Sequence, residues 1–336
     1  CNKPKIKCAK CGNQSYGSLN ESVIEKHLRG GAVIGIYPMN LDETCHFLAI
    51  DFDKEGWKKD ISVIRNICSQ FEIPIAIERS QSGNGCHAWF FFDQKVSAVS
   101  ARKFGTSLLT HSMDKRYEIS FKSYDRLFPN QDTMPKGGFG NLIALPLQKV
   151  ARDNDNSVFI DENFKPYSDQ WQFLSSIPKL NEKNMMSLIT ELTRGNDLGT
   201  LKNEVSETKP WVKQSIVLKK HDFPETVKIV TSDMLYVEKK GLSQKALNTL
   251  KRFAAFKNPE FYKAQAMRRS TYGKDRVISC SDNYENYLAL PRGCEDDIKS
   301  LLKRKNVTLI HEDESNPGKM INIEFRGVLR DEQQSA

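Results

Sequence analysis

Leu48-Ala49-Ile50-Asp51-Phe52-Asp53-Lys54 is an apolar run that ends in two carboxylates. This pattern predicts a buried strand that carries both acids at its end. Residues i and i+2 of a strand point to the same face, so Asp51 and Asp53 should lie roughly 6–7 Å apart and repel each other unless a cation lies between them. Phosphoryl-transfer enzymes hold pairs of divalent ions in this way. The alternative is a strand that runs into an acidic turn.

The composition is that of a soluble globular protein. The chain of 336 residues has 39% hydrophobic and 27% charged residues and is long enough for two domains. It shows no apolar run that could span a bilayer and no signal peptide. Its eight cysteines lack the dense spacing of a disulfide framework, so we expect a reducing, cytoplasmic location and no membrane partner. The net charge of +8 is a mild bias toward polyanions.

Three cysteines near the start predict a structural zinc site. Cys8 and Cys11 form a C-x2-C knuckle, and Cys1 precedes them. A structural zinc ion needs four ligands, so Cys1 is the candidate third and His27 the nearest further one, with Cys45 behind it. The alternative is a set of unrelated surface thiols.

The periodicity that follows predicts alternating strands and helices. Ala32–Tyr37 and Phe47–Ile50 flank a turn-rich segment and are expected to pair as a hairpin that brings the two acids to a sheet end. The mixture indicates an α+β fold rather than a doubly wound sheet. Strands are expected over 32–37, 47–53, 73–78, 86–92, 142–147 and 157–161, with helices over 56–71 and 99–113.

A second constellation is the stretch Arg79-Ser80-Gln81-Ser82-Gly83-Asn84-Gly85-Cys86-His87. A Ser/Gly-rich turn between two strands offers backbone N–H groups to a phosphate, and His87 would stand at its mouth. A lone glycine-rich hairpin is often only a turn, and a lone histidine is often a core residue. Both features follow the Asp-x-Asp strand by about one helix, and that combination is much rarer.

Residues 123–147 are long for a loop in a compact domain and carry Arg126 and Lys136 among aromatic and glycine residues. Loops of this length are usually functional or disordered, although a flexible surface loop is the alternative. The strand expected over 157–161 ends in Asp161. A third acidic ligand from elsewhere in the sequence would complete a two-metal site.

In order, Asp51-Phe52-Asp53, Ser82–His87 and Ile160-Asp161 resemble the three motifs of the archaeo-eukaryotic primase (AEP) superfamily. The likeness is closest to the primase-polymerase domain of bacterial TOTE conflict systems and covers about residues 1–180. One departure is that Gly85-Cys86-His87 stands where the superfamily often has Ser-x-His, so the serine's role would move to Ser80 or Ser82. The narrower likeness rests on 42–45, 124–132, 137–147, 156–163 and 169–171.

The resemblance implies an RRM-like catalytic sheet beside a small α/β unit, and a template-directed primase-polymerase of a mobile-element or phage conflict system. Its substrates would be NTPs or dNTPs and its partner a DNA template with primer. Asp51, Asp53 and Asp161 would be catalytic and would hold two Mg²⁺ or Mn²⁺ ions. The residues expected to bind the nucleotide are His87, Ser80, Ser82, Gly83, Gly85, Arg79, Lys54 and Lys136.

Two other functions remain open from the residues. A non-catalytic nucleic-acid-binding module that recruits a helicase would have little reason to keep unpaired acids, which are costly to bury without a cation. A two-metal nuclease would need the same acids but has no use for a histidine loop that grips a triphosphate.

The second half of the chain is predicted to bind nucleic acid. Residues 239–276 hold eleven Lys and Arg against Glu260 and Asp275, with aromatic residues between them. A solvated helix face is the alternative. Lys251 is expected to point outward. The residues proposed for nucleic-acid binding are Arg126, Lys251, Arg252, Lys257, Arg268 and Arg269.

Residues 253–268 and 325–333 resemble the segments that lead to a superfamily 2 helicase in TOTE proteins. No G-x-x-x-x-G-K-[ST] loop occurs in this sequence, so such a motor would lie in the rest of a longer chain or in a partner. The predicted organisation is a zinc segment (1–30), the catalytic domain (31–185), a linker (186–209) and a basic α/β accessory domain (210–336).

Overall fold

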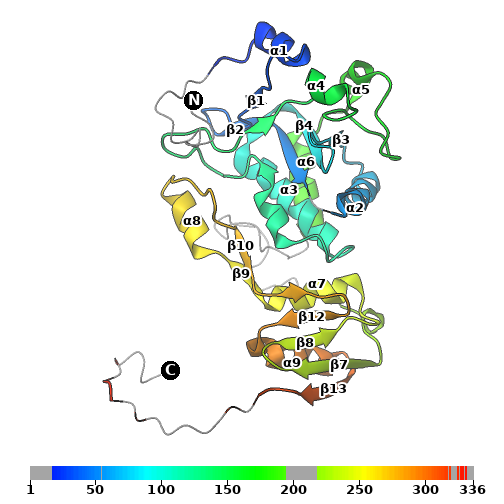
Figure 1. Cartoon of the computed structure of the whole chain (residues 1–336), viewed down its shortest axis with the longest axis vertical. Helices are drawn as coiled ribbons and strands as arrows, with labels where there is room; N and C mark the ends of the chain where they lie inside the picture. Colours follow the sequence, from blue (N-terminus) through cyan, green and yellow to red (C-terminus); the bar gives the residue numbers. More distant parts are fainter. Residues whose placement is uncertain are drawn as a thin grey trace.

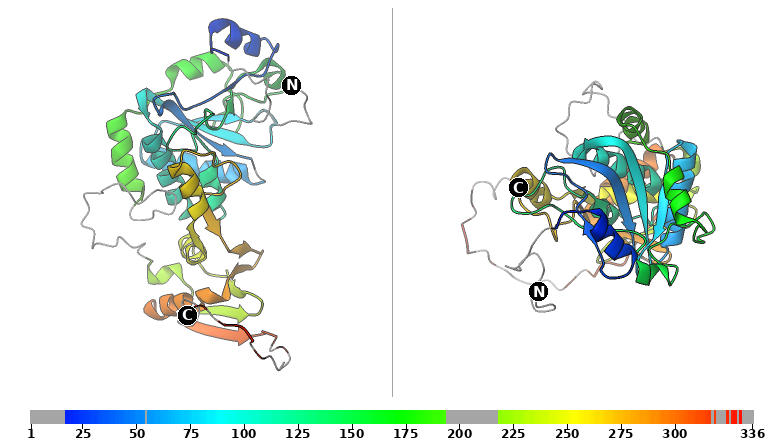
Figure 2. Two further views of the ribbon diagram at one scale, coloured as in Figure 1. Left: turned by 90° about the vertical axis from the view of Figure 1, so that its left-hand side faces the viewer. Right: turned by 90° about the horizontal axis from the view of Figure 1, so that it is seen from above.

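The computed structural model describes residues 17–53, 55–193 and 218–316, with the isolated positions 318, 324, 326–328 and 330. Its described part has two units along the long axis, with α1 at one end and the strands of the second unit at the other (Figures 1 and 2). None of its described helices has the length and apolar character needed to cross a bilayer.

The two helices predicted for the first unit and the strands over 47–53 and 86–92 are present, whereas the strand predicted over 157–161 is wrong, because this segment forms only isolated bridges at Phe159 and Ile160. The helices and strands are α1 (Glu21–Leu28), β1 (Gly35–Ile36), β2 (Thr44–Phe52), α2 (Trp57–Gln70), β3 (Ala76–Arg79), β4 (Cys86–Ser97), α3 (Ala98–Met113), η2 (Phe121–Asp125), β5 (Leu127–Phe128), β6 (Ile143–Ala144), α4 (Lys149–Arg152), α5 (Gln170–Ser176) and α6 (Glu182–Thr193).

The central sheet of this unit is antiparallel and has the order β3-β4-β2-β5. Helix α3 packs on one face, where Leu48 lies under Gly105 and the ring of Phe90 meets that of Phe104 edge-on at 5.3 Å. Because side chains alternate along a strand, Phe47 and Asp51 project from the opposite face. The face opposite α3 therefore carries the polar groups at one end of its strands, beside the apolar side chains of Phe47, Trp89 and Phe91. The mixed α+β class is confirmed.

The predicted hairpin between Ala32–Tyr37 and Phe47–Ile50 is wrong. Strand β1 pairs instead with β6, through Gly35 opposite Ala144, in a separate two-stranded sheet. Both edges of β2 are already occupied, by β4 and by β5, so no edge remains for β1.

The second unit has its own hydrophobic core under a five-stranded sheet with the order β11-β12-β8-β7-β13. Strands β7 and β13 are parallel, and the remaining neighbours are antiparallel. Its elements are η3 (Lys220–Asp222), β7 (Thr226–Thr231), β8 (Leu235–Glu238), α7 (Gln244–Phe253), β9 (Ala255–Lys257), α8 (Pro259–Ala266), β10 (Val277–Ser279), β11 (Asp282–Asn283), β12 (Tyr287–Leu290), η4 (Arg292–Cys294), α9 (Glu295–Arg304) and β13 (Thr308–Asp313).

A buried ionic network joins the two units. Asp132 pairs with Arg102 of α3 and accepts a hydrogen bond of 2.7 Å from the Gln265 amide of α8. Arg276, which has no exposed surface, donates to the carbonyl oxygen of Asn130 at 2.5 Å. Burial by itself would raise the pKa of Asp132, but the charges of Arg102 and Arg276 and the hydrogen bonds lower it overall. The segment after β5 is thus fixed by residues more than 130 positions away.

Candidate active site

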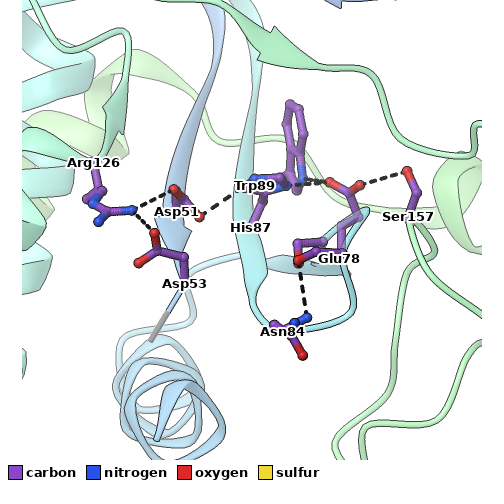
Figure 3. Close-up of polar contacts among 10 residues, drawn as sticks. Asp51, Asp53, Glu78, Asn84, His87, Trp89, Arg126 and Ser157 are labelled. Atoms are coloured by element: carbon purple, nitrogen blue, oxygen red, sulfur yellow. Dashed lines mark hydrogen bonds and ion pairs between the residues drawn. The ribbon is translucent and has the colours of Figure 1, made fainter. Parts of the chain in front are cut away.

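The polar face of the central sheet carries one row of side chains that crosses its strands. Asp51 on β2 lies opposite His87 on β4, and His87 lies opposite Glu78 on β3. At one end the amide of Asp51 donates to the carbonyl oxygen of Arg126 at 3.0 Å, and at the other end Glu78 bridges to Phe159. Cross-strand neighbours in such a row are in side-chain contact, so register alone assembles the site (Figure 3).

Arg126 lies between the two predicted catalytic acids. Its Nη1 is 3.1 Å from Asp51 Oδ2 and also contacts Asp53 Oδ2 (Figure 3). Asp53 is 48% exposed and Asp51 21%, so the pair is accessible from one side. The expected cation between the carboxylates is therefore supplied here by a side chain, and the mutual repulsion of the acids is already balanced.

His87 is hydrogen-bonded through one ring nitrogen and faces an acid with the other. Nδ1 donates to Glu78 Oε2 at 2.9 Å, and Nε2 is 3.8 Å from Asp51 Oδ1. Burial lowers the pKa of His87, but the hydrogen bond to Glu78 and the charges of Glu78 and Asp51 outweigh it and raise the pKa above its usual value. The ring is therefore well suited to carry positive charge toward an anion.

The predicted phosphate turn is a tight hairpin loop between β3 and β4. Its amides at Ser80, Gly83 and Asn84 bond within the loop, to Gly85 O, Ser80 O and Ser82 Oγ. A Cβ on Gly85 would come within 2.3 Å of the carbonyl oxygen of Phe52, so only glycine lets the loop approach the end of the Asp-x-Asp strand. Ser80 and Ser82 are 3.3 Å apart at their hydroxyls. The loop adjoins the acids as expected, but three of the expected free amides are used internally.

Three basic residues, Arg79, Lys136 and Lys54, were predicted to assist nucleotide binding, and the first two lie in the described part of the chain. Arg79 donates to the carbonyl oxygens of Asp155 and Phe164 and so holds two loops, and its assignment to phosphate binding stays a prediction. Lys136 has an exposed side chain, and its assignment stays a prediction. Lys54 lies outside the described residues.

Asp161 is not brought to the other two acids. Ile160 bonds to the backbone of Ile77 on β3, so Asp161 lies beyond that edge and three strand spacings from β2. At about 4.8 Å per spacing the backbones are roughly 14 Å apart, too far for shared ions. Its carboxylate accepts the amides of Asn163 and Lys165 at 2.9 and 2.8 Å and so stabilises its own turn. This placement argues against Asp161 as a ligand beside Asp51.

Asp51 and Asp53 nevertheless fit a hydrated hard cation. A pocket of about 90 Å³ adjoins the pair and is also lined by Asp60, Glu118 and Lys122. Mg²⁺ keeps several waters and is usually bound through one or two carboxylates together with substrate phosphates. Within the described part of the chain, no three His, Cys, Asp or Glu side chains are grouped to hold a metal ion by themselves.

Of the candidate zinc ligands, His27 and the more distant Cys45 lie in the described part of the chain, whereas Cys1, Cys8 and Cys11 fall outside it; Cys45 is a buried free cysteine of β2. The His27 ring is 1% exposed. Its Nδ1 accepts the amide of Ile34 at 3.0 Å, and its Nε2 bonds to Pro146 O at 3.1 Å. Both nitrogens are hydrogen-bonded in the packing of α1, and the assignment of His27 to a zinc site stays a prediction.

The basic residues of the second half do not form the expected outward face. Lys251 is 8% exposed and donates to the carbonyl oxygen of Tyr117 at 2.7 Å, and burial lowers its pKa to about 8. Arg268 pairs with Glu43 of the first unit, and Arg252 lies 5.8 Å over the ring of Phe121. Lys257 is half-buried, while Arg269 is exposed. Much of this charge therefore contacts the first unit.

Sequence reasoning missed Glu78 and the two further groups that it binds, Trp89 and Ser157. Trp89 Nε1 donates to Glu78 at 2.9 Å, and the Ser157 hydroxyl does so at 3.1 Å. The available signal was an acid that directly follows the apolar run Ile73–Ile77, in a strand whose side chains alternate between the two faces of the sheet. That signal becomes specific only when the register places Glu78 beside His87.

One comparison identifies a family. The sequence model of the protein family described as "TOTE conflict system, Archaeo-Eukaryotic Primase domain" matches residues 1–188, more than half of the chain. No curated protein matches the chain.

Proposed function

Because the chain belongs to the archaeo-eukaryotic primase domain family of TOTE conflict systems, we propose that it catalyses template-directed transfer of nucleotides from NTPs or dNTPs to a primer or a new chain. The observation that carries this proposal is the row Asp51–His87 beside Asp53, which combines a carboxylate pair with an imidazole suited to an anion. Divalent ions held by the two acids would neutralise the triphosphate and activate the attacking hydroxyl.

The protein's own groups have separable roles in this proposal. His87 Nε2 binds a phosphate oxygen of the nucleotide, and the loop Ser80–Gly85 lines the same end of the strands. Arg126 is half-exposed and, once released from the acids, can contact phosphates of the nucleotide or of the DNA. Arg269 and Lys257 remain candidates for template contact, since neither is buried.

Primer extension separates the candidate functions. The full chain is incubated with a primed and an unprimed template, labelled nucleotides and Mn²⁺ or Mg²⁺. Template-dependent product supports the polymerase. Shortening of the primer without incorporation would identify the nuclease instead, and tight template binding without either product would identify the binding module.

A variant of Arg126 tests whether this side chain competes with the metal. We expect R126A to bind Mn²⁺ several-fold more tightly than the wild type, because the guanidinium no longer occupies the carboxylates. Titration calorimetry of the nucleotide-free protein measures this directly. R29A, which breaks the exposed pair of Arg29 with Glu25, neither of which lines this pocket, is the matched control. Weaker Mn²⁺ binding by R126A would contradict the proposed competition.

A variant of His87 tests the phosphate contact. Loss of one charge-assisted hydrogen bond costs roughly 1.5–3 kcal/mol, so H87A should raise the KM for nucleotide about tenfold to a hundredfold. Template affinity and melting temperature should change little. H46A removes an exposed histidine from β2 and should leave all three quantities unchanged. An H87A protein with an unchanged KM for nucleotide and a clearly lowered melting temperature would show that His87 only packs in the core.

A further inference from the structure

A buried carboxylate lies directly behind His87 and has no direct part in the proposed reaction. Glu78 is 2% exposed and accepts hydrogen bonds from three side chains, two on β4 and one on the segment after α4. Oε2 accepts from His87 Nδ1 and Trp89 Nε1, both at 2.9 Å, and Oε1 accepts from the Ser157 hydroxyl at 3.1 Å (Figure 3). Burial of a carboxylate costs free energy unless the group is paired and hydrogen-bonded, and these three donors offset that cost.

Two of the three donors, Trp89 and Ser157, hold the Glu78 carboxylate in place. The Trp89 ring is fixed by contacts with Phe47 and Phe91, at centroid distances of 5.2 and 6.1 Å. Ser157 is 2% exposed and has φ +54°, a left-handed conformation that an L-residue adopts only at a cost. Glu78 is therefore held from two sides before it meets His87.

The third donor is the one that connects Glu78 to the proposed chemistry. With its proton donated to Glu78, Nδ1 is unavailable to any ligand, and Nε2 is the ring nitrogen that faces Asp51. Without Glu78, the ring could rotate about χ2 or exchange its tautomer, and Nε2 would no longer have a fixed direction.

We propose that Glu78 is a positioning residue, which holds the imidazole of His87 so that Nε2 is presented to the phosphates of the incoming nucleotide. The inference rests on the proposed function, since it concerns the same nucleotide site. It assigns the buried acid of β3 a role that acts only through His87.

Two variants of Glu78 differ in whether they keep the hydrogen bonds. Glu78→Gln retains a carbonyl oxygen that accepts from Nδ1 and Nε1, and its amide can donate to the Ser157 hydroxyl. Glu78→Leu keeps the approximate volume and removes every acceptor. We expect E78L to raise the KM for nucleotide about tenfold or more, close to the effect of H87A, whereas E78Q restores most of the nucleotide affinity. Trp89→Phe, which removes one donor and leaves the bond to His87, should alter KM much less.

The same substitutions in an H87A background distinguish positioning from a general loss of stability. If Glu78 acts through His87, then E78L added to H87A raises KM no further, because the group it positions is gone. An equal increase in both backgrounds would overturn the proposal. So would an E78L protein with unchanged KM in the wild-type background.

A spectroscopic measurement on the unaltered protein does not depend on folding of the variants or on activity. Nitrogen-15 NMR of histidine-labelled protein, with His87 assigned by its absence in H87A, should show a protonated Nδ1. An Nδ1 without a proton would overturn the inference. If the wild type incorporates no nucleotide, then the proposed function fails, while this spectrum still decides whether Glu78 holds the ring.

Discussion

Replacement of Asp51 and Asp53 together by asparagine should abolish nucleotide incorporation and leave the fold intact. Asp51 and Asp53 are the two carboxylates proposed as metal ligands, and asparagine at both positions removes the negative charge that a hard cation needs from them. We expect a loss of at least a thousandfold in rate, since metal activation and charge neutralisation contribute several kcal/mol to such transfers. Primer extension with Mn²⁺ measures the loss.

The structure changes the expected stability of this double variant. Repulsion between two unpaired acids would make their removal stabilising, but Arg126 already contacts both. Because Arg126 is 35% exposed, water can solvate it when the acids are gone. The melting temperature and the template affinity should therefore remain close to the wild type. Extension by the double variant at the wild-type rate would refute the polymerase proposal, whatever its stability.

The largest loss of stability is expected from Asp132→Ala. Asp132 is 5% exposed and neutralises Arg102, which is 1% exposed, and Gln265 of the second unit donates to it. Removal of one member of a buried pair leaves an uncompensated charge and typically costs about 3–5 kcal/mol. Chemical denaturation of the full chain, followed by circular dichroism, measures the change in unfolding free energy.

The surface pair Lys149–Asp153 provides the control for this variant. Its side chains are 47% and 53% exposed, so Asp153→Ala should cost only about 0.3–0.5 kcal/mol. The lowered pKa of Asp132 also gives a pH dependence. Its contribution is complete above the unfolded value of about 4 and is lost as the pH falls through the lower folded value. A D132A protein as stable as D153A would show that the network does not hold the units together.

Local sequence patterns were sufficient for the elements and for part of the site. The alternation in Leu48–Asp53 requires that Asp51 and Asp53 share a face wherever the strand is placed, and the Ser/Gly-rich stretch before His87 predicted the turn between two strands. Helices α2 and α3 begin and end within a residue of the predicted bounds, because an apolar stripe with a period of 3.6 residues is a local property.

Only the tertiary structure decided which distant groups meet. The strand order β3-β4-β2-β5 puts Glu78 beside His87 and leaves Asp161 three strands from Asp51, and neither follows from sequence spacing. Docking of the second unit buries Lys251, which its helix pattern placed in solvent. The side chains of each segment determine its own periodicity, so helices and strands can be predicted locally. Strand register and the docking of the two units depend on the total free energy of many long-range contacts, which no single segment contains.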